Sequence, residues 1–423
     1  MPHQVPLTVI APIKPGQRES LEQALGRMRA DVAHNDVIPF GKLPGLHFAR
    51  LLVLDETVDL RGETIPAQLV FLEDLDAPLD DRLIELTRVA AGGLDEIFRH
   101  CEGYPASGPV AARDQVAYLR AHMVEPAANY VNTVGLSLQQ IRQQAQLRDA
   151  IEAFLDGRDW SDCTPEDVRR GIQTFVRGEP ALGWALRPAE GPGLFFRLKE
   201  LAHFVAVPLA LLIASPAILL ALPGLLALLR ALELTDRAPV ARPNDARILQ
   251  LASLEDHIVQ NQFSAAGLLK PGWFRRTTAS LVLWLVYWGV RHLFNRADLA
   301  GVKSIHFARW IFIDGKRRLI FASNYDGSLE SYMDDFIDKV AWGLNAVFSN
   351  GVDYPRTSWL VRDGAEDELA FKYFIRTHQL PTQVWYSAYP ELTGINIENN
   401  AQIRAGLFKT MNARETEEWL RRF

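Results

Sequence analysis

Two histidine–arginine pairs are the first residues whose types could support chemistry. The sequence His-Phe-Ala-Arg occurs twice, with His47 and Arg50 in one copy and His306 and Arg309 in the other. An imidazole can transfer protons or bind a metal, and a guanidinium can bind an anion. Because side chains three apart on a regular strand point to opposite faces, we expect each histidine to face away from its arginine. The alternative is that both histidines are hydrogen-bonded core residues that fix their strands.

A second set of candidate residues is polar, aromatic and carried by one copy only. Asp326 lies in the sequence Ser-Asn-Tyr-Asp-Gly-Ser (residues 323–328), where the other copy has Glu-Asp-Leu-Asp-Ala-Pro. This carboxylate could accept a proton, with Arg309 or Arg356 binding an anion. Asp326 or Ser328 could equally cap the helix that follows. We predict His306, Arg309, Asp326 and Arg356 as catalytic residues, and as substrate-binding residues Asn324, Tyr325, Asn350, Tyr386 and Tyr389.

Composition and missing motifs exclude several classes of protein. The 423 residues carry a net charge of −6 without a long basic run, which argues against nucleic-acid binding. The two cysteines, Cys101 and Cys163, cannot form a disulfide framework, and no cysteine or histidine spacing indicates a metal site. The sequence contains no nucleophile elbow, phosphate-binding loop or dinucleotide motif. It also opens without the pattern of a secretory signal, so we expect a cytosol-facing protein.

An internal repeat must position these candidates. Lys-Pro-Gly at residues 14–16 recurs at 270–272, an offset of 256, and Tyr-Pro at 104–105 recurs at 354–355, an offset of 250. Together with the repeated His-Phe-Ala-Arg, these matches form a collinear series, which indicates a duplicated domain. The sequence predicts three segments: repeat 1 at residues 1–157, a helical insertion at 158–254, and repeat 2 at 255–423.

Each repeat has the element order β-α-β-β-α-β. In repeat 1 we predict strands at 7–13, 46–54, 67–72 and 129–134, with helices at 17–32 and 80–98. In repeat 2 we predict strands at 259–269, 305–313, 318–322 and 383–389, with a helix at 329–348; the Asp-Gly at 314–315 favours a hairpin. This order is that of the ferredoxin-like motif, whose sheet has helices on one face only. Two such sheets can bury their open faces against each other.

In this duplicated order the sequence resembles the dimeric α+β-barrel superfamily, in the single-chain form seen in dye-decolorising peroxidases and chlorite-dismutase-like haem proteins. The resemblance implies an α+β fold of two paired ferredoxin-like sheets and, as the family chemistry, haem-dependent oxidation. Residues 323–327 partly match the Gly-x-x-Asp-Gly signature of the peroxidases, with Ser323 in place of the first glycine. No histidine here is assigned as a haem ligand.

The insertion contains a run that predicts contact with a membrane. Residues 207–229 include no charged side chain, and about 20 such residues can span a bilayer as a helix. A single crossing would place the two repeats on opposite sides of the membrane, where their sheets could not pair. We therefore predict a monotopic attachment through a helical hairpin that turns near Pro216, with Leu212 and Leu219 also in contact with lipid.

A second apolar segment, residues 277–290, occupies the first-helix position of repeat 2. Repeat 1 has the polar sequence QRESLEQALGRMRADV there, so only one copy carries an apolar helix. Tryptophan and arginine side chains surround the segment, as is typical of helices at the level of lipid headgroups. We predict that Trp284 and Trp288 contact the membrane. The alternatives are two buried core helices or a dimer interface.

These observations lead to two main functional hypotheses. The first is a membrane-associated protein on the cytoplasmic face, with a barrel pocket in repeat 2 that binds or oxidatively transforms an apolar, lipid-like substrate with haem as the implied cofactor. The second is a non-catalytic, membrane-peripheral lipid-binding or scaffold protein. A third is a soluble homo-oligomer whose apolar segments bury each other.

Overall fold

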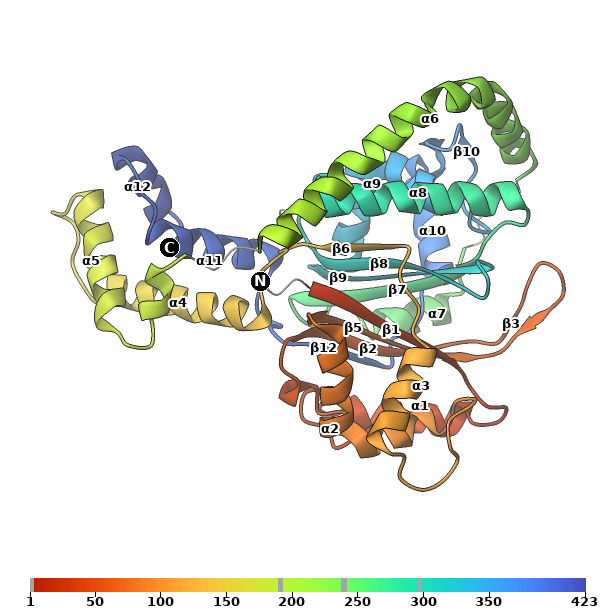
Figure 1. Ribbon diagram of the computed structural model, residues 1–423, viewed down its shortest axis with the longest axis horizontal. Coiled ribbons are helices and arrows are strands. Elements are labelled where there is room, and N and C mark those ends of the chain that lie inside the picture. Colours follow the sequence, from red (N-terminus) through yellow and green to blue (C-terminus); the bar gives the residue numbers. More distant parts are fainter. Residues whose placement is uncertain (1–3, 189–192, 237–241, 295–297) are drawn as a thin grey trace.

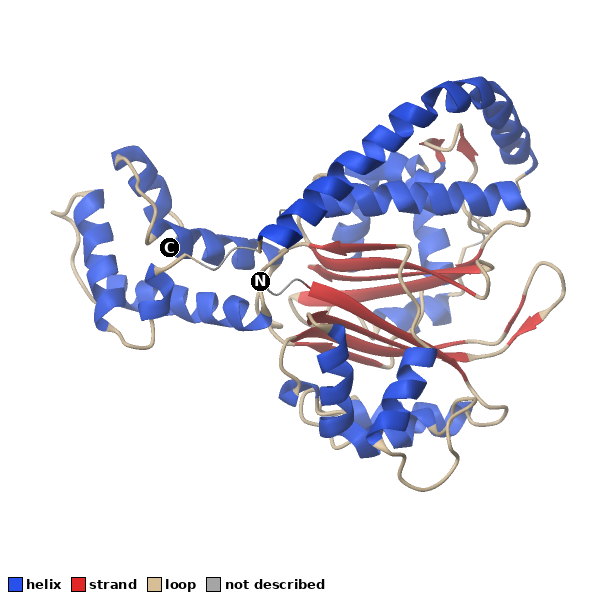
Figure 2. Ribbon diagram, in the orientation of Figure 1, coloured by secondary structure: helices blue, strands red, loops and turns tan. Residues whose placement is uncertain are grey.

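The computed structural model describes residues 4–188, 193–236, 242–294 and 298–423, which form a mixed α+β structure. Two four-stranded antiparallel sheets lie at its centre (Figure 2). The first sheet has the strand order β1-β5-β2-β12, with β1 (Gln4–Pro12), β5 (Gln68–Asp76), β2 (Leu46–Leu54) and β12 (Val384–Ser387). The second has the order β6-β8-β9-β7, with β6 (Ala128–Val131), β8 (Ile305–Ile313), β9 (Arg318–Asp326) and β7 (Gln260–Leu268).

Each sheet takes its shortest strand from the opposite half of the chain. Strand β12 pairs with β2, with Tyr386 opposite Ala49, and β6 pairs with β8, with Tyr130 opposite Ala308. The sequence analysis assigned each of these strands to its own repeat, so the strand segments are confirmed but their pairing partners differ. Because of this exchange, residues 1–157 and 255–423 (the first and second halves below) cannot separate without breaking both ladders.

The two sheets pack face to face, as Figure 2 shows. Aliphatic side chains fill the space between them, including Leu52 and Val70 from the first sheet and Ile311 and Ile320 from the second, all fully buried. Alternation along each strand supplies these residues on one face only. These described residues therefore form a packed apolar core between the two sheets.

Helices cover the outer face of each sheet (Figure 1). The periodic apolar positions predicted for 80–98 and 329–348 are buried on the sheets, so both helices are confirmed. The first sheet carries α1 (Arg18–Met28), α2 (Leu79–Phe98) and α3 (Ala112–Ala121), and the second carries α8 (Trp273–His292), α9 (Leu329–Phe348) and α10 (Glu368–His378). The remaining short elements are η1 (Phe40–Lys42), β3 (Thr57–Val58), β4 (Thr64–Ile65), α7 (Asp245–Ala252), β10 (Thr357–Ser358), β11 (Arg362–Asp363) and η3 (Gly364–Glu366).

A helical arm projects from one end of the sheets (Figure 1). It combines α4 (Leu138–Asp156), α5 (Pro165–Gly178) and η2 (Gly183–Leu186) with α11 (Gly394–Gly406) and α12 (Ala413–Leu420). The arm has its own buried core, which includes Ile151, Ile172, Ile403 and Trp419. A Cβ at Gly406 would collide with the Trp419 indole, so the close packing of α12 on α11 requires glycine there. The arm thus joins residues from all three predicted segments.

The apolar insertion forms one continuous helix, α6 (Leu194–Thr235), which bends instead of turning back as a hairpin (Figure 1). The turn that the sequence analysis expected near Pro216 is therefore wrong. Pro208, Pro216 and Pro223 all lie inside the helix. A proline removes one backbone hydrogen bond and bends a helix without necessarily ending it. In the described part of the chain, α6 is the one helix that is long and apolar enough to cross a membrane.

Both ends of α6 are attached to α8. Near its start, Glu200 accepts hydrogen bonds from Arg291, and near its end Asp236 accepts from Lys270 and Arg275, each at 2.7 Å. The 42 residues of α6 extend about 63 Å as a helix, whereas the 20 residues of α8 extend about 30 Å. The middle of α6 must therefore bow outward. We call residues 208–228 the arch.

Candidate functional site

The structure brings together two of the four predicted catalytic residues. His306 donates from Nε2 to Oδ1 of Asp326 at 2.7 Å, and the first half has the matching pair His47 and Asp76 at 3.1 Å. Both histidines are almost fully buried. The hydroxyl of Tyr389, a predicted substrate residue, lies 3.0 Å from Nδ1 of His47.

The second carboxylate oxygen of each aspartate contacts the start of an arm helix. Oδ2 of Asp326 accepts from the backbone N–H of Gly394 at 2.8 Å, and Oδ2 of Asp76 accepts from that of Leu138 at 3.1 Å. A carboxylate at a helix N-terminus is stabilised by the unpaired N–H groups there. Each His–Asp pair therefore holds one arm helix, α11 or α4, against its sheet. The cap of α9 comes instead from Ser328, which accepts from the N–H of Ser331.

The expectation that each histidine and its arginine face opposite sides is wrong. Strand β8 has a register irregularity between Ile305 and Phe307, and β2 has one between Leu46 and Phe48. An extra residue at such a bulge shifts the alternation of side chains. The His306 and Phe48 ring centroids are 5.5 Å apart, and Arg309 donates to the Leu7 carbonyl; both partners belong to the first sheet. Both side chains therefore point toward the other half.

Arg309 and Arg50 cross the space between the sheets in opposite directions. Arg309 donates to the carbonyls of Leu7 and Glu73 and to the Asp74 carboxylate, while Arg50 donates to the carbonyls of Phe263 and Ser323. Burial lowers the pKa of Arg50 to about 9, against the opposing effect of Asp74. These guanidinium groups are engaged by protein atoms on several sides, so neither is an open anion clamp.

The remaining predicted site residues lie in separate environments. Arg356 donates to the backbone carbonyl of Asp236 at the end of α6, and the Asn324 side chain bonds with Arg50, Asp74 and Trp385. Tyr325 stacks on Tyr332, Tyr386 stacks on Phe40, and Asn350 is fully buried beside Lys270. None of the nine predicted catalytic and substrate residues lines the apolar cavity described below.

A stability measurement can separate the structural role of Asp326 from a catalytic one. Asparagine at this position would direct an N–H₂ group at either His306 or Gly394, which both offer N–H donors. We expect Asp326→Asn to lower the free energy of unfolding by about 1–3 kcal/mol, measured by urea denaturation.

Asp76→Asn is the matched control, because it breaks the same contacts at α4. We expect a similar loss, with faster hydrogen exchange in residues 138–156 instead of 394–406. Unchanged stability of Asp326→Asn beside a destabilised Asp76→Asn would contradict the structural assignment.

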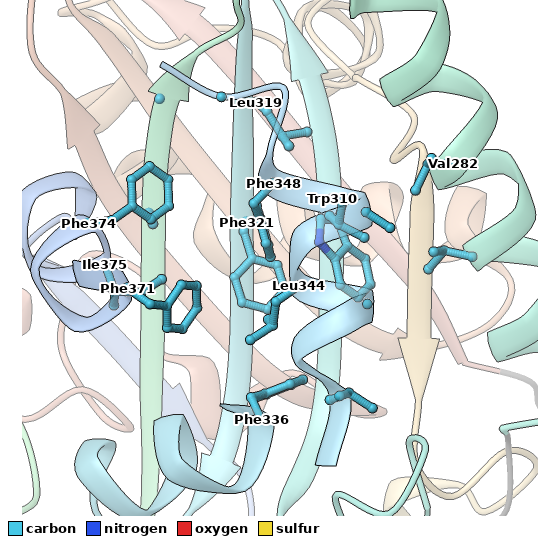
Figure 3. A pocket seen from close by; sticks show the side chains of 18 of the residues that line it. Val282, Trp310, Leu319, Phe321, Phe336, Leu344, Phe348, Phe371, Phe374 and Ile375 are labelled. Carbon is cyan, nitrogen blue, oxygen red and sulfur yellow. The ribbon is translucent and has the colours of Figure 1, made fainter. Parts of the chain in front are cut away.

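An apolar cavity lies on the helix-covered face of the second sheet (Figure 3). It has a volume of about 360 Å³ and is enclosed by β7, β8 and β9 on one side and by α8, α9 and α10 on the other. Apolar side chains form nearly all of its wall; those labelled in Figure 3 are Val282, Trp310, Leu319, Phe321, Phe336, Leu344, Phe348, Phe371, Phe374 and Ile375.

Few polar groups reach this cavity. The histidine in its described lining, His378, bonds through Nδ1 to the carbonyl of Phe374 at 2.9 Å. Burial lowers the pKa of His378, although the Phe374 carbonyl acts in the other direction, so the imidazole is neutral at pH 7. The hydroxyl of Tyr332 is bonded to Ser323. The cavity is therefore suited to an uncharged, apolar ligand.

The sequence analysis did not find this cavity, because it placed the pocket between the sheets. One signal was available in the comparison of the repeats. Strand β7 carries Ala265 and Gly267 in the cavity wall, where β1 has Val9 and Ala11 at an offset of 256. The smaller side chains on β7 leave space beside the second sheet, whereas the larger side chains on β1 fill the corresponding space beside the first sheet.

Haem does not fit this lining. An engineered cavity of about 150 Å³ holds benzene, so 360 Å³ holds about 14 carbon-sized atoms, far fewer than a haem contains. The edge of the His378 ring packs on Gly267, where a Cβ would lie 2.9 Å from the imidazole Cδ2. Among the described residues of the lining, none is a lysine or arginine that could bind the haem propionates. Neither a protein-family model nor a curated protein matches the chain.

The predicted membrane-contact residues lie on the outer surface beside this cavity. Leu212 and Leu219 are about two-thirds exposed on the arch, where Pro216 is also exposed. Trp284 is exposed on α8, while Trp288 is half-buried because it stacks on Phe204 of α6. Exposed apolar side chains therefore occur both on the arch and on α8, the helix that walls the cavity.

Proposed function

We propose that the chain is a monotopic, membrane-associated protein that binds an apolar, lipid-like ligand in the cavity of its second half. The observation that carries this proposal is the position of α8, which has Val282, Val286 and Val290 in the cavity wall and Trp284 on its outer surface. A ligand that partitions into the bilayer would find the cavity one helix away from the lipid.

The shape of α6 supports attachment to one leaflet over a full crossing. Both ends of this helix are bonded to α8, so they lie on the same side of the proposed membrane. Along the arch, large apolar side chains face outward, with Leu220 86% exposed. Exposing such a surface to water is unfavourable, and burying it among acyl chains would contribute about 25 cal/mol per Å².

We also propose that the two halves are copies of one ferredoxin-like unit, paired as a pseudo-dimeric α+β barrel with boundaries near 157 and 255. The equivalent strand orders, the reciprocal exchange of β6 and β12 and the two His–Asp pairs support this. For the side of the membrane we propose the cytoplasmic face, since Cys101 and Cys163 are both free thiols.

Vesicle flotation and lipid analysis test the function. We expect the purified full chain to float with phosphatidylcholine vesicles and to carry an apolar lipid that organic extraction and mass spectrometry detect. The control is the vesicle-free gradient, in which the protein should stay at the bottom. A monodisperse, detergent-free protein that neither floats nor carries lipid would overturn the proposal in favour of a soluble protein or oligomer.

A further inference from the structure

The first half provides an internal reference for what the cavity of the second half holds. Helices α2 and α9 are both 20 residues long, and each has one non-helical residue at the same place, Ala90 and Val340, at an offset of 250. At that same offset, three residues further along, both helices carry a glycine, Gly93 and Gly343. The two glycines have very different surroundings.

In the first half, the chain itself covers Gly93. The 17 residues between α1 and β2 fold over α2 and bury Val37, Ile38 and Phe40. The approach is so close that a Cβ at Gly93 would collide with the carbonyl oxygen of Val37. The space between this helix and its sheet is therefore filled by an apolar stretch of the protein's own chain.

In the second half, the matching space is the cavity. The connection between α8 and β8 has 12 residues, five fewer than its counterpart. A Cβ at Gly343 would meet only Val340, at 3.9 Å, and Gly343 lines the cavity. Among the described residues, nothing takes the position that Val37 has over Gly93.

We infer that a single acyl chain of about 14 carbon atoms occupies the cavity and lies over Gly343, where residues 37–40 lie over Gly93 in the first half. This inference rests on the proposed function and names its ligand. A peptide is disfavoured as the occupant, since its amide groups would lose their hydrogen bonds to water in a wall that offers few polar partners. A sterol or a two-chain lipid exceeds the volume.

The polar end of the ligand lies at the mouth of the cavity. Leu285 on α8 and Trp342 on α9 both line the cavity and are both exposed, at 40% and 58%. These two side chains mark an opening between α8 and α9. The exposed Trp284 also belongs to α8. An acyl chain can therefore enter from the lipid while its headgroup stays outside.

Binding of fatty acids to the full chain in phosphatidylcholine nanodiscs tests this assignment. We use acids of about 8, 14 and 22 carbons, chosen around the capacity of the cavity, and displacement of a fluorescent fatty acid as the readout. We expect the middle length to bind at least tenfold tighter than the shortest and tighter than the longest. Lysophosphatidylcholine with the middle chain shows whether the source is a membrane lipid or a free acid.

Gly343→Leu fills the cavity from the α9 side. We expect it to weaken binding of the middle acid at least tenfold without lowering the melting temperature, because the new side chain enters open space. Gly26→Leu is the matched control, since Gly26 is a helical glycine on α1 with nothing within 4 Å of its Cβ position. It should bind as wild type does.

Two results would overturn the inference while leaving the proposed function intact. One is wild-type affinity in Gly343→Leu, and the other is binding of the longest acid or of cholesterol as tight as that of the middle acid. If wild type binds none of these probes and does not float with vesicles, the proposed function itself has failed.

Discussion

Replacing Arg309 with methionine lowers the free energy of unfolding by about 3–5 kcal/mol, the usual cost of removing one partner of a buried ion pair. Its guanidinium and the Asp74 carboxylate are 3% and 8% exposed. Methionine keeps much of the side-chain volume but removes the cation that is hydrogen-bonded to Asp74 in the core. The carbonyls of Leu7 and Glu73 also lose their donors. Urea unfolding followed by circular dichroism measures the loss.

Two further variants make this result specific. Arg421→Met removes an arginine that pairs with Glu417 on the surface, and we expect a change below about 1 kcal/mol. Arg309→Lys keeps the charge without the planar fork, so it should fall between wild type and methionine. Stability equal to wild type in Arg309→Met would contradict the assignment of Arg309 to the core and return it to the candidate catalytic residues.

Placing aspartate at Leu212, Leu219 and Leu220 of the arch reduces binding to phosphatidylcholine vesicles by more than 100-fold. Each aspartate costs about 2.5–3.5 kcal/mol at the centre of a membrane helix, and 100-fold requires about 2.7 kcal/mol in total. The effect should therefore be large even if the arch enters only the outer part of one leaflet. Flotation at increasing lipid concentration gives the change in partition coefficient.

The matched control places aspartate at three exposed apolar residues elsewhere: Leu60, Ile84 and Leu369, which are 51–59% exposed. It should float as wild type does. The far-ultraviolet circular dichroism of both triple variants should match wild type, since no altered side chain is buried. An arch variant that still floats would contradict the membrane assignment. If wild type does not float and the arch variant changes from oligomer to monomer, the arch is a self-association surface.

Much of the secondary structure could be predicted from the sequence, because it depends on local patterns. The helix at 329–348 and the strand at 305–313 coincide with α9 and β8. Their spacings of about 3.6 and 2 residues are set by backbone geometry, which a short window of sequence reveals. The predicted strand at 318–322 stops four residues before β9 ends, because Ser323 and Asn324 are polar although they pair in the sheet.

The candidate site could not be predicted in the same way. His306 and Asp326 are both near strand ends, and their polarity suggested chemistry. Their partners, the arm helix at Gly394 and the ring of Phe48, are 68 or more residues away along the chain. A polar residue needs a partner when buried, and a single sequence does not show whether that partner is a substrate or the protein's own backbone.

What the sequence determined by itself was the strands around both sheets, the long helices 80–98 and 329–348, and the apolar composition of residues 207–229. The arm helices were not predicted. Tertiary structure alone decided that β6 and β12 exchange sheets, that bulges turn both histidines inward, and that α6 bows into an arch. It also decided that the cavity lies outside the paired sheets. The physical reason is that periodicity specifies which face of an element is buried but not which segment covers that face. In the second half the connection between α8 and β8 is short, and none of the residues that the structure describes covers the space over Gly343.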